Sequence, residues 1–69
     1  MKFKVGDKVK VISLDNSFVN YFNKAVFGYF LNKTFTVYNA TNSYVTVEEN
    51  AFTWSNEDLI LINNGLEIE

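Results

Sequence analysis

The residue types that most often carry out catalysis are scarce in this sequence. The 69 residues include no histidine and no cysteine, so imidazole and thiol chemistry and cysteine-ligated zinc are excluded. Two acidic pairs could in principle act as general acids and bases, namely Glu48–Glu49 and Glu57–Asp58. The first pair is expected to point to opposite faces of a strand, and the second is typical of the start of a short helix. We therefore expect no enzymatic activity, no metal site and no cofactor.

Lysines are the other group that could do chemistry, and they are concentrated near the N-terminus. Residues 1–24 hold five lysines and two aspartates, a balance of 5 − 2 = +3, whereas residues 25–69 hold one lysine and six acids, 1 − 6 = −5. The candidate nucleic-acid contacts are Lys2, Lys4, Lys8 and Lys10. The net charge of −2 and the lack of arginine oppose this function, so a nucleic acid is not the expected partner.

Alternation of polar and apolar residues predicts a domain built mostly of β-strands. Residues 2–5 and 8–11 alternate, and Gly6–Asp7 between them is a turn signal. The residues expected to point into the core from these segments are Phe3, Val5, Val9 and Val11. Residues 51–54 and 59–62 predict two further strands, joined by one helical turn capped by Ser55.

The firmest local prediction is a hairpin formed by residues 34–38 and 44–48 across the polar segment 39–43. Its register is expected to pair Phe35 with Val47 and Val37 with Val45 on the buried face. On the outer face it pairs Thr36 with Thr46 and Tyr38 with Tyr44.

Two segments are harder to assign. Apolar residues between positions 14 and 33 follow helical spacing, but Gly28 and the many aromatic residues oppose a long helix. We expect a long loop here, and the sequence does not decide whether a helical turn forms near residues 17–23. The alternative is an α+β domain with a helix over residues 16–31. Asn63–Asn64–Gly65 is expected to end the last strand. Residues 64–69 are therefore expected to form a flexible tail, and the domain itself to cover residues 1–63.

Three motifs in this order resemble small SH3-like β-barrel domains of the bacterial and phage (KOW-like) type. Residues 5–11 read x-G-D-x-V-x-V, Gly28 precedes the strand at residues 34–37, and residues 54–59 read W-x-x-x-D-L. The resemblance covers about residues 3–62. It implies a five-stranded SH3-like barrel with a long first loop and one 3-10 turn before the last strand.

The resemblance does not extend to a ligand. KOW-type relatives carry a basic loop where this chain has the uncharged residues 26–30. SH3 domains that bind proline-rich peptides carry an acidic first loop, where this chain has only Asp15. One fold of this kind hosts many functions, so the ligand must be argued from other residues.

The sequence holds more large apolar side chains than a five-stranded barrel of this size can bury. Contiguous exposed apolar surface usually marks an interface, and Tyr and Trp often dominate the binding energy there. The candidate partner-binding residues are Tyr21, Phe27, Tyr29, Phe30, Tyr38, Tyr44 and Trp54. In the opposing interpretation, the first loop folds over the barrel and buries its own aromatic rings, and Trp54 closes one end of the barrel.

These features predict a non-catalytic protein-interaction module that binds a host protein, with inhibition as one sub-case, or that self-associates as a homodimer. The alternative is a weak RNA- or single-stranded-DNA-binding barrel that uses the four N-terminal lysines. Residues with AT-rich codons (Asn, Lys, Ile, Phe and Tyr) are favoured, which indicates a phage, prophage or low-GC bacterial source. Without a signal-like segment or a membrane-spanning apolar run, a cytoplasmic location is expected.

Overall fold

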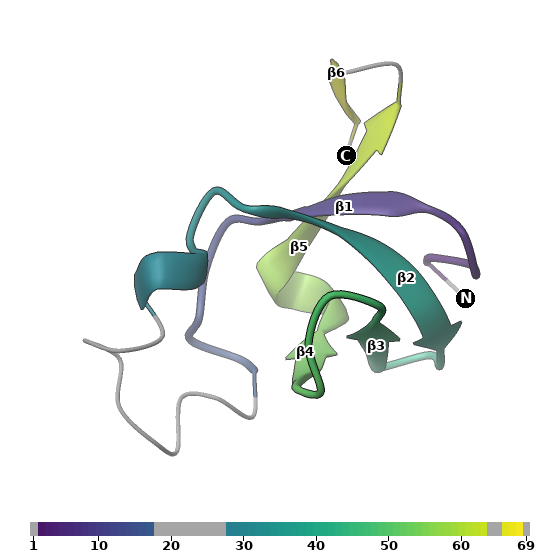
Figure 1. Ribbon diagram of the computed structural model, residues 1–69, viewed down its shortest axis with the longest axis horizontal. Helices are drawn as coiled ribbons and strands as arrows, with labels where there is room; N and C mark the ends of the chain where they lie inside the picture. Colours follow the sequence, from purple (N-terminus) through teal and green to yellow (C-terminus); the bar gives the residue numbers. More distant parts are fainter. Residues whose placement is uncertain (1, 18–27, 64–65, 69) are drawn as a thin grey trace.

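The computed structural model describes residues 2–17, 28–63 and 66–68, which form a small all-β domain (Figure 1). Its strands are β1 (Lys8–Val11), β2 (Thr34–Ala40), β3 (Tyr44–Val47), β4 (Thr53–Ser55), β5 (Leu59–Asn63) and β6 (Leu66–Ile68). They follow the order β4-β3-β2-β1-β5-β6 in one antiparallel sheet. The described residues contain two 3-10 turns, η2 (Gly28–Phe30) and η3 (Asn56–Asp58), and no α-helix. The mostly-β class and the 3-10 turn before the strand at residue 59 are confirmed.

β1 is the central strand, because it pairs with β2 on one side and with β5 on the other. Val9 lies opposite both Phe35 and Leu61, and Val11 lies opposite Leu59. Both valines are fully buried while Lys8 is exposed, so the side chains follow the period of two that the sequence predicts. The first strand of the chain, β1, therefore lies side by side with β5, as Figure 1 shows.

The segment before β1 differs from its prediction. Residues 2–5 form no strand, because the chain turns tightly at Gly6, whose φ of +93° is readily adopted by glycine. The Asp7 N–H donates to the Lys4 carbonyl at 3.0 Å, and the Lys4 N–H donates to the Asp7 carboxylate at 3.0 Å. The Gly6–Asp7 turn is confirmed. This turn leaves Val5 65% exposed, so its expected place in the core was wrong.

The β2–β3 hairpin forms, but its predicted register is wrong. Val37 lies opposite Val47 and Ala40 opposite Val45, with a bulge between Val37 and Asn39. The cause is local, because the Thr41 hydroxyl accepts the N–H groups of Ser43 and Tyr44 at 3.2 and 3.1 Å and closes a shorter loop than expected. None of the four predicted cross-strand pairs, Tyr38 with Tyr44 included, is formed.

The core lies between the curved halves of the sheet and η3. Its buried members are Phe3, Val9, Val11, Leu14, Phe35, Val37, Val45, Val47, Trp54 and Leu59, with Phe30, Ala40, Phe52 and Leu61 packed against them. An aromatic cluster centres on Phe30, whose ring centroid lies 5.6–5.9 Å from those of Phe35, Phe52 and Trp54. Edge-on and tilted rings at this spacing attract each other beyond simple burial.

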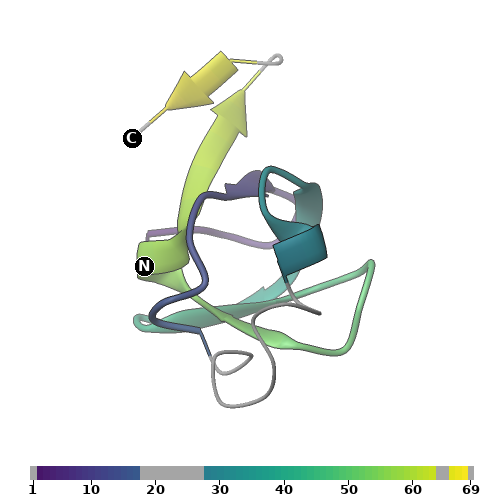
Figure 2. The ribbon, with the colours of Figure 1, turned by 90° about the vertical axis from the view of Figure 1, so that its left-hand side faces the viewer.

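The structure adds a strand that the sequence did not predict. Residues 66–68 form β6 and pair with β5, Asn63 opposite Leu66 and Leu61 opposite Ile68. The hairpin of β5 and β6 projects from the body of the domain in both ribbon views (Figures 1 and 2). The expected helical turn near residues 17–23, and most of the alternative helix over 16–31, lie outside the described residues.

Candidate functional site

The seven aromatic candidates divide into exposed, buried and undescribed residues. Tyr29, Tyr38 and Tyr44 are 71%, 66% and 47% exposed. Phe30 is half-buried in the aromatic cluster, and Trp54 is fully buried, so the indole offers no exposed surface to a partner. Tyr21 and Phe27 lie outside the described residues.

The three exposed tyrosines do not form one patch. Tyr29 belongs to η2, at the left of Figure 1, whereas Tyr38 and Tyr44 belong to the β2–β3 hairpin at the other end of β2. Two aliphatic residues at the η2 end, Ile12 and Leu31, are also exposed, by 48% and 40%. The apolar surface at the η2 end is therefore the stronger candidate for a binding site.

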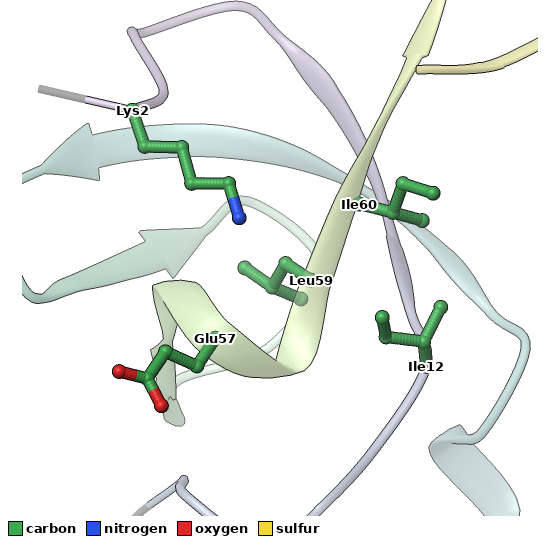
Figure 3. Close-up of a pocket in the computed structure, with 5 residues that line it drawn as sticks. All are labelled: Lys2, Ile12, Glu57, Leu59 and Ile60. Atoms are coloured by element: carbon green, nitrogen blue, oxygen red, sulfur yellow. The ribbon is translucent and has the colours of Figure 1, made fainter. Parts of the chain in front are cut away.

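Two hollows meet at Ile12. One, of about 120 Å³, is lined by Lys2, Ile12, Glu57, Leu59 and Ile60 (Figure 3). The other, of about 460 Å³, is lined by Ile12, Ser13, Leu14, Asp15, Gly28 and Leu31. Because Ile12 lines both, we treat the two hollows as one surface and call it the Ile12 groove.

Backbone hydrogen bonds at the end of β1 place the walls of the Ile12 groove. The Ile12 N–H donates to the carbonyl of Asp58 at 2.8 Å, which holds Ile12 beside the start of β5. The Asn32 N–H donates to the carbonyl of Val11 at 2.8 Å, which brings the turn after η2 against the same strand end. Asn32 has φ = 66°, a left-handed conformation that asparagine tolerates better than most residues.

Asp58 fastens the beginning of the first loop. Its fully buried carboxylate accepts the Asn16 N–H at 3.1 and 3.2 Å, the Asn16 side-chain amide at 3.0 Å and the hydroxyl of Ser17. The Ser17 hydroxyl in turn accepts the Ser55 N–H at 2.9 Å. Sequence reasoning assigned Asp58 to a helix start and missed this role. No signal in the sequence could have found it, because the donors lie 42 and 41 residues earlier in the chain.

The two charged side chains of the smaller hollow, Lys2 and Glu57, point in different directions. Figure 3 shows the Lys2 ammonium directed toward Leu59, whereas the Glu57 carboxylate turns away from Ile12 and Ile60. The Lys2 ammonium also lies 5.4 Å from the centroid of the Phe3 ring, an attractive cation–π distance. One cation therefore faces the apolar lining.

The N-terminal lysines are not arranged as a row of equivalent cations. Lys8 donates from its ammonium to the Thr36 hydroxyl at 2.5 Å, and that hydroxyl donates to the Glu49 carboxylate at 3.0 Å. Lys10 shares the outer face of β1 with Lys8, while Lys2 and Lys4 precede the turn at Gly6. Part of the positive charge of Lys8 is thus balanced within the domain.

Glu49 is a second acid whose role the sequence did not indicate. Its carboxylate accepts the Thr36 N–H at 2.8 and 3.0 Å. Burial raises the pKa of Glu49, but the hydrogen bonds from Thr36 and from its own N–H, with the charge of Lys8, outweigh it and hold the pKa below its ordinary value of 4.5. Glu49 thus joins the end of β3 to β2.

We expect Glu49→Gln to weaken the dependence of stability on acid. Because the folded-state pKa lies below that of the unfolded chain, the stabilisation by Glu49 is fully present above pH 4.5 and is lost as the pH falls through the folded-state pKa. Urea unfolding at about pH 7 and about pH 3 should therefore show a smaller difference in the variant than in the wild type. The exposed neighbour Glu48 supplies the control Glu48→Gln, and an equal effect of both substitutions would contradict the assignment.

Two further features are absent from the described residues. They contain no group of three or more Asp or Glu side chains placed to hold a metal ion. Within the same ranges, no helix has the length and apolar character needed to cross a bilayer.

Comparison with known proteins assigns no family to the chain. No protein-family model matches it, and neither the curated proteins nor the solved structures give a match. The function therefore has to be argued from the fold and from the Ile12 groove.

Proposed function

We propose that this chain is a non-catalytic protein-interaction domain of the SH3-like barrel type, and that it docks through the Ile12 groove and the adjoining Tyr29. The strand order, with β1 between β2 and β5 and a 3-10 turn before β5, supports this barrel type together with the sequence motifs. The observation that carries the function is the exposure of Ile12, Leu31 and Tyr29 around two hollows. Contiguous apolar surface of this kind usually marks an interface.

The energetic argument follows from burial. Fully burying an isoleucine is worth about 1.5–3 kcal/mol, so covering the 48% of Ile12 that is exposed contributes about 1 kcal/mol. Leu31 and Tyr29 add to this when the same partner covers them. From the AT-rich codon bias we propose a phage or prophage source and a host protein as partner, in the cytoplasm. Self-association is the competing choice.

Nucleic acid is the less favoured partner. Lys8 is hydrogen-bonded to Thr36 and lies beside the Glu49 carboxylate, which reduces the positive potential available to a phosphate backbone. Lys2 is directed toward an apolar lining, where a phosphate chain gains little.

The proposed function is tested by affinity capture from a lysate of a low-GC bacterial host. We expect a protein that the wild type retains and that Ile12→Asp loses, because the substitution places a charge in the contact. Val5→Asp is the matched control, since Val5 is an exposed aliphatic residue before β1 while Ile12 follows it. Circular dichroism should show that both variants are folded.

Two results would contradict this function. One is an identical set of captured proteins for wild type, Ile12→Asp and Val5→Asp. The other is micromolar, salt-sensitive binding to labelled RNA or DNA in fluorescence anisotropy that Lys8→Glu with Lys10→Glu abolishes, which would establish the nucleic-acid alternative.

A further inference from the structure

We propose that the Ile12 groove selects an extended apolar segment of a partner protein that carries a carboxylate at the Lys2 end. This inference rests on the proposed function and adds the chemistry of the partner. The observations behind it are the apolar residues of the two hollows and the orientation of Lys2 and Glu57.

Each hollow has an apolar part, and the two parts share Ile12. Ile12, Leu59 and Ile60 form the smaller hollow, and Ile12, Leu14 and Leu31 form the apolar part of the larger one. Ligand sites are typically about 300–1,000 Å³, and the larger hollow, at about 460 Å³, falls within this range. An apolar segment laid across Ile12 would cover side chains that are now half exposed to water.

The Lys2 end supplies the cation. The Lys2 ammonium is directed toward Leu59, and the Glu57 carboxylate of the same hollow turns away from Ile12 and Ile60 (Figure 3). A partner carboxylate placed here approaches Lys2 over an apolar surface, where less water screens the ion pair than in open solvent. The ammonium is held near this position by the Phe3 ring at 5.4 Å.

The two hollows differ in their polar lining. Asp15, Ser13 and Gly28 line the larger hollow, whereas the Lys2 ammonium belongs to the smaller one. A carboxylate on the partner segment is attracted to Lys2 at the smaller hollow. The chemistry therefore favours a segment whose acid lies on one side of its apolar run.

The experiment is selection of a phage-displayed library of random peptides on the immobilised full chain. The wild type should enrich peptides in which a run of apolar residues is flanked on one side by Asp or Glu. Lys2→Glu should reverse this preference to Lys or Arg. Lys4→Glu is the matched control, because it changes the net charge equally at an exposed lysine that lines neither hollow, and it should keep the acidic preference.

Affinities for one enriched peptide give the magnitudes. Lys2→Gln should weaken Kd by about twofold to fivefold, the range for an exposed ion pair. Ile12→Asp should weaken it about tenfold or more, whereas Val5→Asp should leave it unchanged.

The outcomes separate this inference from the proposed function. Apolar peptides without a charge preference, lost on Ile12→Asp, would overturn the selection of a carboxylate and leave the interaction domain standing. Failure to enrich any peptide, or enrichment that Ile12→Asp does not affect, would overturn the groove as a binding site. A dimer in light scattering that Ile12→Asp dissociates would make a second copy of the chain the occupant and would also overturn the inference.

Discussion

Replacing Asp58 with asparagine is expected to lower the free energy of unfolding by about 3 kcal/mol. Domains have about 0.05–0.15 kcal/mol of stability per residue, so a loss of this size is a large share of the total for a 69-residue chain. The expectation arises from the fully buried carboxylate and from the donors that converge on it.

The geometry explains why asparagine cannot replace Asp58. Both carboxylate oxygens accept hydrogen bonds, Oδ1 from the Asn16 N–H and side-chain amide and Oδ2 from the Asn16 N–H and the Ser17 hydroxyl. Asparagine keeps one acceptor oxygen and places an NH₂ donor where the other stood. With that NH₂ in the place of Oδ2, the Ser17 O–H loses the oxygen that accepts it. A buried donor left without an acceptor costs about 1–3 kcal/mol.

Urea unfolding of Asp58→Asn checks this expectation, and Glu57→Gln is the control. Glu57 is the exposed neighbour in η3, and its substitution should change the stability by about 0.5 kcal/mol or less. A change of similar size in Asp58→Asn would show that the hydrogen bonds to Asp58 do not fasten the first loop.

The sequence predicted the elements whose signal is local. Val9 and Val11 alternate with lysines in β1 and are buried, and Ser55 accepts the Glu57 N–H at 3.3 Å as the cap of η3. The register of β2 and β3 could not be predicted from alternation, because alternation is satisfied equally by registers that differ by two residues. The Thr41 hydroxyl and the bulge decided between them.

The parts of the site that depend on distant residues were not predictable. Asp58 meets Asn16 and Ser17 across 42 and 41 residues, and no spacing rule in the sequence links them. The Ile12 groove likewise joins the end of β1 to the turn after η2 and to the start of β5. Ile12 was not among the candidate partner-binding residues, because aromatic residue type was given more weight than position.

Trp54 was singled out for its residue type, although its side chain is fully buried. Its substitution gives the other large expected effect. Trp54→Ala is expected to lower the free energy of unfolding by about 3–5 kcal/mol, the usual cost of removing a buried large aromatic side chain. The ring is fully buried, and its centroid lies 5.6 Å from that of Phe30 and 5.7 Å from that of Phe35. Its Nε1–H donates to Asn50 Oδ1 at 3.2 Å, which satisfies the only polar atom of the indole.

Trp54→Phe separates packing from hydrogen bonding. Phenylalanine keeps a ring against Phe30 and Phe35 but gives up the bond to Asn50 and part of the volume, so we expect a loss of about 1–2 kcal/mol. Unfolding should be followed by far-UV circular dichroism, because Trp54 is the only tryptophan. In the wild type, its emission should be blue-shifted and protected from acrylamide until the chain unfolds.

The same variant distinguishes a core residue from a partner-binding residue. Once folded, Trp54→Phe should bind a peptide enriched on the wild type with unchanged affinity, because the indole lines neither hollow of the Ile12 groove. A binding loss without a loss of stability would instead place Trp54 in the interface, as its residue type had suggested. A stable, folded Trp54→Ala chain would contradict the packing argument as well, since the indole packs on Phe35 and donates to Asn50.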